Sequence, residues 1–492
     1  MIPFASLLAS VDPRPDPRLS ERARLSQIDA SMRGPAVLFV VTALAWLAAA
    51  TVLGLIASIK LHAPYFLSGT EFLTYGRLAP ACANLLVYGW GCNVAFAVGL
   101  WIMARLCETQ VKHLGMLYVA GGVWNFGVFW GVAAIVLGGS TSVEWLEMPA
   151  GVGPVLGSSY LLIALWVILC FQYRQAGPVY VSQWYLLAAF CWFPWIYFVG
   201  EMMTLWAPAR GTVQALADGW FVQNALGLWF TPVGLAAIYY CLPKVLGRPI
   251  RHYYLAPLGF LVLALFSPWT GARNLIYGPV PVWIQTVSIA ASVVLVVTMV
   301  VTAINFHLTA WAGRRDVWES PTLRFVVFGA VAFTLSAVIG VVTALRSVNV
   351  VTHFTQFAVG QGVNGLYAFF TMAMFGVIYF MLPRLLEREW PSRLLIQWHF
   401  WGTGAGVVLM LAALYIGGWN QGMLMNDATV PFIAVVRQLV PVNELRTLAL
   451  ASMAVGLVAF CLHVVLMLVG ALISASRAVL VKNGILREGS VG

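Results

Sequence analysis

Twelve long apolar runs constrain the fold of this chain more than any other feature. A helix needs about 20 apolar residues to cross a bilayer. Only 9% of the residues are charged and 61% are hydrophobic, which excludes a soluble domain of this length. The sequence therefore predicts an all-α polytopic membrane protein with twelve transmembrane helices. The apolar runs lie near 36–58, 80–104, 115–138, 155–173, 181–206, 219–243, 253–271, 281–306, 325–345, 358–382, 396–418 and 447–474.

The basic residues predict how the chain is oriented. An even number of spans places both termini on one side, and about three quarters of the Lys and Arg then fall on that side. We therefore expect a cytoplasmic tail at 1–34, one membrane domain at 35–475 and a second cytoplasmic tail at 476–492. The net charge of +10 reflects these topology signals and predicts no nucleic-acid partner.

The seven Cys residues are scattered and form no CxxC pair, which predicts neither a disulfide framework nor a Cys metal site. The absence of CxxCH also excludes covalently attached haem c.

Several polar and aromatic motifs interrupt the apolar runs in a recognisable order. In order and spacing they resemble the catalytic subunit I of the C-type (cbb3) haem–copper cytochrome c oxidases, across essentially all twelve runs. The motifs are "RLAPACANLLVYGWG" at 77–91, "FVQNALGLWFTPVGLAAIYYCLPKVLGRP" at 221–249, "SPWTGARNLIYGPVPVWIQ" at 267–285, "ALRSVNVVTHFTQFAVGQGVNG" at 344–365 and "IYFMLPR" at 378–384.

The resemblance implies where the family's cofactor ligands would lie, and none of those positions holds His. The haem-ligand positions fall on Cys82, Gln361 and Val363, and the copper-ligand positions on Gln223, Arg273 and Asn274. The tyrosine that the family joins to a copper ligand falls on Ser267, and an acidic residue near its active site falls on Ile339. We therefore expect this chain to bind neither haem nor copper and to have no intact catalytic residue.

The residues now at these positions are poor replacements. Cys82 could ligate haem iron as a thiolate, but it would face Val363, which has no donor atom. Gln offers copper only an amide oxygen, whereas copper prefers imidazole and sulfur. Arg273 is permanently cationic and would repel a metal.

A few other residues are candidate substitutes or partner contacts. Of the seven His, only His463 is expected well inside a span, while the others fall at predicted span ends or in loops. Arg346 and Arg446 match arginines that lie near haem propionates in the family. Glu201 lies near the end of the fifth span, where it is either interfacial or part of a proton or partner contact.

The stretch "FAVGQGVNGLYAFF" at 357–370 combines small and polar residues at membrane depth. In the family, a haem lies against each side of this helix. A space of that size is not left empty at protein packing density. We expect it to be filled either by large side chains, since the chain has 21 Trp and 28 Phe, or by a lipid tail or a quinone-like molecule.

Three functions follow as hypotheses for a protein of the bacterial inner (plasma) membrane. The first is a non-catalytic scaffold or interaction subunit of a respiratory complex, beside membrane-anchored c-type cytochromes or another oxidase subunit. The second is an active cbb3-type terminal oxidase that reduces oxygen with proton translocation, holding two b-type haems and copper through unrecognised ligands. The third is a membrane small-molecule binder or transporter.

Overall fold

The computed structural model describes residues 20–482, and within this range it is helical without β-strands. Twelve helical units in this range are long and apolar enough to cross a membrane, which confirms the predicted fold class. The first six units are α2 (Glu21–Lys60), α3–η2–α4 (Tyr75–Leu106), α5 (Leu114–Val136), α6 (Val152–Gln172), α7–η3 (Val181–Trp206) and α8–η4–α9 (Thr212–Leu246). The last six are η5–α10–η6–η7 (Tyr253–Leu275), α11–α12 (Val282–Ala312), α14 (Pro321–Ala344), α16–η8–α17 (Gln356–Leu386), α18 (Arg393–Met425) and α19 (Phe432–Lys482).

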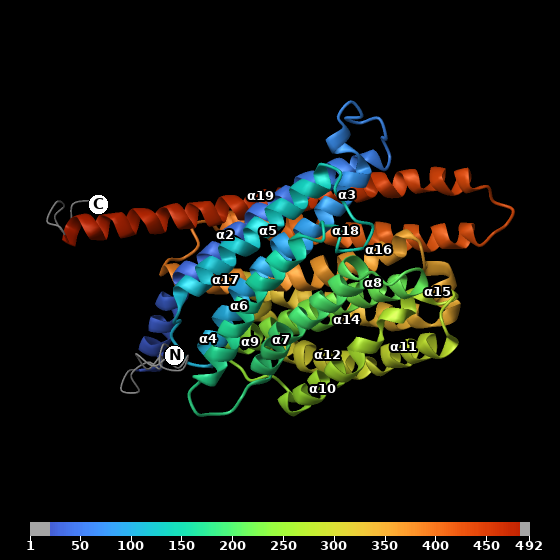
Figure 1. Ribbon diagram of the computed structural model, residues 1–492. Helices are drawn as coiled ribbons and strands as arrows, with labels where there is room; N and C mark the ends of the chain where they lie inside the picture. The colour runs from blue at the N-terminus through green and yellow to red at the C-terminus, as the bar shows by residue number, and fades with distance from the viewer. Residues whose placement is uncertain (1–19, 483–492) are drawn as a thin grey trace.

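Short helices connect some of these units. They are η1 (Glu71–Leu73), α13 (Arg314–Glu319) and α15 (Arg346–Thr352). The helices run side by side, and α18 and α19 form a long hairpin along one edge (Figure 1).

The first helix begins at Glu21, inside the segment expected to be a tail. Ser20 caps it, because its hydroxyl accepts a hydrogen bond from the Ala23 amide at 3.3 Å. Asp29 is buried in this polar stretch, accepts a hydrogen bond from Trp101 and lies 3.7 Å from Arg105. These contacts explain why the helix begins at Glu21, before the start of the apolar run near residue 36. The rest of the predicted tails, 1–19 and 483–492, lies outside the described residues.

Three of the central spans widen into π-helix at corresponding points. The widened segments are η2 (Leu85–Cys92), η4 (Ala225–Phe230) and η8 (Asn364–Thr371). A fully buried Asn immediately precedes or begins each one, and these Asn residues stand 140 residues apart at Asn84, Asn224 and Asn364. π-Helical turns concentrate at functional sites. This regular spacing is visible in the sequence, and it marks three equivalent places in the fold.

The Asn side chains bond to the helix that carries them or to its neighbour. Asn84 donates to the Pro80 carbonyl and Asn224 donates to the Trp220 carbonyl, each four residues back and at 2.8 Å. The Asn364 amide lies 3.1 Å from the Tyr415 hydroxyl of α18. Each Asn side chain thus has a hydrogen-bond partner at membrane depth, while the Oδ1 atoms of Asn84 and Asn224 have none among residues 20–482.

Aromatic side chains form a dense core among α4 (Asn93–Leu106), α5, α6, α7 and η4. Tyr160 packs on Phe193 with ring centroids 4.7 Å apart, and Trp229 packs on Phe193 at 5.1 Å. Phe96 contacts Trp124 at 5.1 Å in an edge-to-face arrangement, a favoured geometry for aromatic pairs. This core includes residues of two of the widened helices, through Phe96 of α4 and Trp229 of η4, and packs them against α5, α6 and α7.

Candidate functional site

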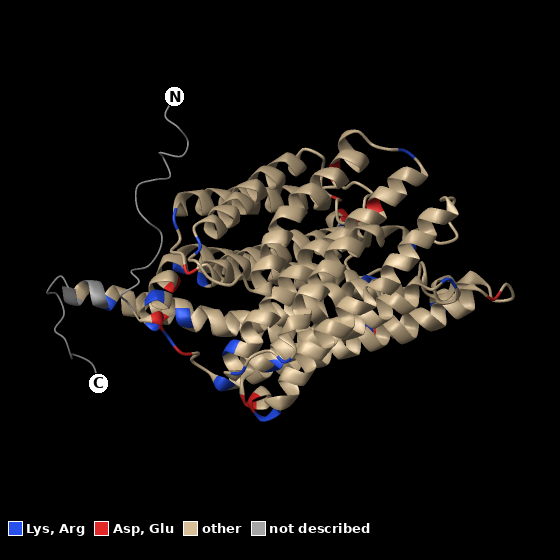
Figure 2. Cartoon of the chain, turned by 90° about the horizontal axis from the view of Figure 1, so that it is seen from below, with Lys and Arg blue, Asp and Glu red and all other residues tan. Residues whose placement is uncertain are grey.

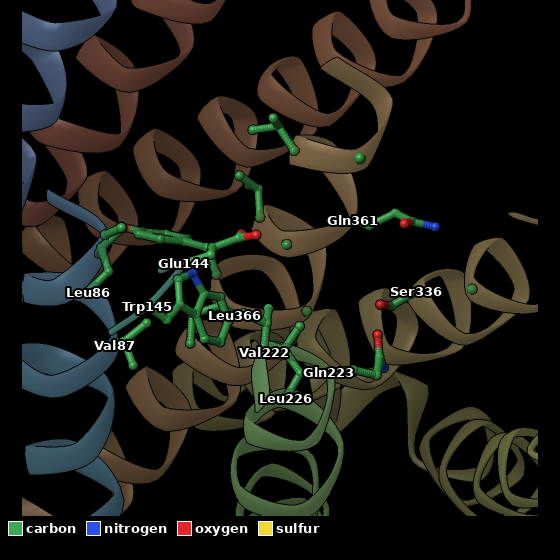
Figure 3. A pocket seen from close by; sticks show the side chains of 18 of the residues that line it. Leu86, Val87, Glu144, Trp145, Val222, Gln223, Leu226, Ser336, Gln361 and Leu366 are labelled. Carbon is green, nitrogen blue, oxygen red and sulfur yellow. The ribbon is translucent and has the colours of Figure 1, made fainter. Parts of the chain in front are cut away.

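A cavity of about 910 Å³ lies between the helices that carry the three widened segments. Its walls include α3 (Tyr75–Asn84), α8 (Thr212–Asn224), α14 and α16 (Gln356–Val363), together with the loop before α6. The leucines two positions after the spaced Asn residues all line it: Leu86, Leu226 and Leu366. In Figure 3, Gln223, Ser336 and Gln361 lie on one side of the view, and Leu86 and Val87 lie on the other. The cavity therefore has both polar and apolar walls.

Most of the site residues predicted from the sequence meet in this cavity. Those that line it are Cys82, Gln223, Ser267, Arg273, Asn274, Gln361, Val363 and Arg446. Those that do not are Ile339, Arg346, Glu201 and His463. Residues from six separate helical elements are brought together in this way, so the cavity is the candidate functional site.

Arg273 on η7 (Gly271–Leu275) links three elements of the fold. Its Nη2 donates to Gln223 Oε1 on α8 at 2.8 Å, and its Nη1 donates to the Gly340 carbonyl on α14 at 3.0 Å. It forms no ion pair with a carboxylate of residues 20–482. The guanidinium therefore holds α8, η7 and α14 together through bonds to neutral oxygens alone.

The other polar residues at the expected ligand positions also have protein partners. Gln361 Nε2 donates to the Thr343 hydroxyl of α14 at 2.6 Å. The Cys82 thiol donates to the Ala50 carbonyl of α2 at 3.3 Å. These bonds fit structural roles for both side chains, because each satisfies a polar group between packed helices.

The remaining predicted residues lie apart from one another. Glu201 is 3% exposed at the end of α7 and packs against Gly153 of α6. Arg346 begins α15 at the surface, where its carbonyl accepts a hydrogen bond from Tyr277. His463 of α19 is fully buried, and its Nε2 accepts a hydrogen bond from the Ser392 amide at 3.2 Å. The structure therefore groups none of these three with the cavity.

The sequence interpretation of one histidine was wrong. His399 was expected at a span end, yet it is fully buried in α18. Its Nδ1 lies 2.9 Å from the Tyr379 hydroxyl, and its ring stacks on Phe460 at 4.3 Å. The expectation failed because α18 begins at Arg393 and is covered there by α14, α17 (Met372–Leu386) and α19.

Two acids at the cavity were missed by the sequence analysis. Glu144 in the loop before α6 and Asp218 in α8 both line it. Nearby, Glu147 Oε2 accepts a hydrogen bond from Asn84 at 2.6 Å. Burial raises the pKa of Glu147 to about 7 and also raises the pKa of Glu144. No motif identified these acids; the loop before α6 brings Glu144 to the site, and the packing of α8 brings Asp218 there.

Large side chains do not fill the space beside α16. None of the largest fully buried side chains, such as Trp90, Trp124 or Trp229, lines the cavity. A Cβ placed on Gly362 would meet nothing within 4 Å. Aromatic side chains such as Trp145, Tyr367 and Phe369 line this space but leave the cavity of about 910 Å³ open.

Comparison with known proteins identifies the family. The profile of the family described as "Cytochrome C and Quinol oxidase polypeptide I" matches residues 34–452. The chain therefore belongs to this family, and the twelve apolar helices make it an integral inner-membrane protein.

Particular relatives refine this assignment. The chain is 25% identical to the "Cytochrome c oxidase subunit 1 homolog" of Azorhizobium caulinodans, over 82% of this chain and 76% of that protein. It is 24% identical to the "Cbb3-type cytochrome c oxidase subunit CcoN1" of Stutzerimonas stutzeri, over 79% of this chain and 84% of that protein. A solved haem–copper terminal oxidase dimer shares the fold, with a TM-score of 0.69, 14% identity, and coverage of 90% of this chain and 84% of that one. The protein is thus a divergent subunit I homologue, as its motifs predicted.

The residues at the cavity do not fit the haems and copper that the family implies. No group of three or more His, Cys, Asp or Glu within residues 20–482 has an arrangement suited to a metal ion. Gln223 is engaged by the Arg273 guanidinium, whose fixed positive charge opposes a copper ion at the same place. Val363 offers no donor opposite Cys82. The donor set thus suits neither cofactor.

Proposed function

We propose that this protein is a non-catalytic member of the oxidase subunit I family, acting as a scaffold or interaction subunit of a respiratory complex. The observation that carries this proposal is the bonding of Arg273 to Gln223. Two side chains at copper-ligand positions bond to each other there, and one of them is a cation. Polar contacts of Arg273 and Gln361 join α8, η7, α14 and α16 at the same positions.

In the orientation that we propose, both termini of the chain lie in the cytoplasm. Lys and Arg gather at the end of the bundle where α2 begins and α19 ends (Figure 2). Basic residues favour the cytoplasmic side of a membrane. The partners we propose are membrane-anchored c-type cytochromes or another oxidase subunit, which would contact the helix faces around the bundle.

The first experiment is an absorption spectrum of the detergent-purified full chain, oxidised and dithionite-reduced, with metal analysis of the same sample. We expect no Soret band and no copper. Two haems per chain would overturn the proposal and would favour an active terminal oxidase instead. Co-purification of a haem-stained c-type cytochrome with the tagged chain would support the scaffold role, and a clean monomer would contradict it.

Restoring histidine at two of the family's haem-ligand positions tests whether the loss of these ligands abolished haem binding. Cys82→His and Val363→His together place one imidazole on α3 and one on α16, both at the cavity. We expect this double variant to gain a low-spin haem spectrum when expressed with haem supplied, because two axial imidazoles suffice for a b-type haem. The matched control, Cys82→Ser with Val363→Ala, should stay colourless. Failure of the double variant to take up haem would show that the cavity itself no longer accommodates it.

The cavity favours a second candidate function, the binding of a small molecule. Its volume of about 910 Å³ lies within the range of about 300–1,000 Å³ typical of ligand pockets.

A further inference from the structure

Arg446 of α19 is a partly buried cation that lines the cavity. Its Nη1 reaches only Gln356 Oε1, at 3.3 Å, and its Nε is buried without an acceptor among residues 20–482. It forms no ion pair with a carboxylate of those residues. An unpaired charge in an apolar site is costly, and charges inside membrane proteins are normally paired. The site around Arg446 therefore lacks a negative partner.

An apolar strip continues from Arg446 into the cavity. Arg446, Leu450 and Met453 all line it and, at positions i, i+4 and i+7, share one face of α19. Met410 of α18 and Val363 of α16 line the cavity too. The cavity thus has a positively charged end and an apolar path leading away from it.

The acids of the cavity do not supply the missing charge. Neither Glu144 nor Asp218 forms an ion pair with Arg446 or Arg273. Burial raises the pKa of Glu144, which favours its neutral form. Arg273 adds a second positive charge to the lining of the cavity. The arrangement therefore suits an anionic ligand near the arginines.

We propose that the cavity binds an anionic amphiphile, with its carboxylate or phosphate head at Arg446 and its hydrocarbon tail along Leu450, Met453 and Met410. A guanidinium forms charge-assisted, often bidentate hydrogen bonds with such a head, and the apolar strip removes the tail from water. Free fatty acids and anionic phospholipids share this chemistry. The proposal depends on the proposed absence of haem from the same space.

The first test measures which amphiphile the protein retains. The full chain is purified in a non-ionic detergent, its haem spectrum is recorded, and bound amphiphiles are extracted and quantified by mass spectrometry. We expect about one anionic amphiphile per chain in the wild type. Arg446→Gln should lower retention about ten- to hundredfold, the cost of one hydrogen bond to a charged group. Arg437→Gln, at an exposed arginine on the same helix, is the matched control and should retain it.

The second test uses the space beside Gly362. Gly362→Leu projects a side chain into the open cavity and should displace the amphiphile. Gly122→Leu is the matched control, because a Cβ there also meets nothing within 4 Å, but on the exposed face of α5. Retention by Gly362→Leu at the wild-type level would contradict the assigned site. This pair keeps the proposal testable if Arg446→Gln does not fold.

The third test distinguishes a free fatty acid from an anionic phospholipid, and it also tests whether a charged head group is needed. Oleate, phosphatidylglycerol and oleyl alcohol are each added to wild-type protein stripped of lipid, and the Tm is measured. Stabilisation by oleate alone identifies a fatty acid, and stabilisation by phosphatidylglycerol alone identifies a phospholipid. Equal stabilisation by the uncharged oleyl alcohol refutes the role of the anionic head. A haem spectrum in the first sample would overturn both this inference and the proposed function, whereas a colourless protein without amphiphile overturns the inference alone.

Discussion

A double-mutant cycle can measure how much the hydrogen bond between Arg273 and Gln223 contributes to the stability of the fold. Gln223→Leu removes the acceptor that lies 2.8 Å from Arg273 Nη2 and leaves the guanidinium with the Gly340 carbonyl as its remaining partner. A hydrogen bond to a charged group contributes about 1.5–3 kcal/mol. We therefore expect Gln223→Leu to lower the free energy of unfolding by about that amount.

Gln223→Leu should lower the free energy of unfolding only a little when the charge of Arg273 has been removed. In an Arg273→Met background no cation is left to stabilise, and Leu is more favourable than an unpaired Gln in an apolar site. The coupling energy between the two positions should therefore be about 2 kcal/mol, within the range found for residues in contact. Unfolding of the purified protein by SDS in mixed micelles, followed by tryptophan fluorescence, measures all four corners of the cycle.

The exposed ion pair of Arg33 and Glu387 provides a reference value for this coupling energy. Arg33 and Glu387 lie 2.6 Å apart, but their side chains are 43% and 68% exposed, so solvent screens their attraction. Such surface pairs contribute about 0–1 kcal/mol. A coupling energy between Arg273 and Gln223 no larger than that of Arg33 and Glu387 would refute the reasoning, because it would mean that water in the cavity already solvates the guanidinium.

Two further predictions concern helix contacts and pH. Gly362→Ala should raise stability by about 0.5–1 kcal/mol through helix propensity. Gly422→Ala should lower stability by about 1–3 kcal/mol, because the new Cβ would clash with the Val351 carbonyl. Thermal unfolding of both variants measures the sign, and stabilisation by Gly422→Ala would contradict the close approach of α18 to α15. Because burial raises the pKa of Glu147 from 4.5 to about 7, its protonation stabilises the fold fully below pH 4.5, and that contribution is lost as the pH rises through 7. Glu147→Gln should therefore be more stable than the wild type above pH 7 and match it below pH 4.5, and a Tm difference that does not vary with pH would argue against this coupling.

The sequence was sufficient to predict the spans and the residues at the expected ligand positions, for different physical reasons. A span is encoded locally, since apolar length alone decides whether a helix can cross the bilayer. The grouping of Cys82, Gln223 and Gln361 was predicted only through their resemblance to aligned motifs, and the structure places them at one cavity. These predictions did not require knowing how any two helices pack.

Features that depend on packing were not predicted. The partners of Arg273 lie 50 and 67 residues away along the chain, so its role follows only from the placement of three helices. His399 was misplaced because burial near a span end depends on neighbouring helices, not on position within its own. The spacing of Asn84, Asn224 and Asn364 was present in the sequence, yet its meaning depends on the widened turns that follow.

Those widened turns determine where the chain can tolerate a change of length. A π-helical turn contains one residue more than an α-helical turn, so deleting one residue from η2, η4 or η8 would restore regular α-helix without breaking the span. An α-helix advances by about 100° per residue, and the deletion would remove the extra residue held in the wide turn, so the side chains beyond it would keep nearly the same orientation around the helix axis. Val87, Gly227 and Tyr367 lie within these turns and line the cavity, so the residue deleted must be one that does not face it. The three segments are thus points where a helix can lose one residue without turning one half relative to the other.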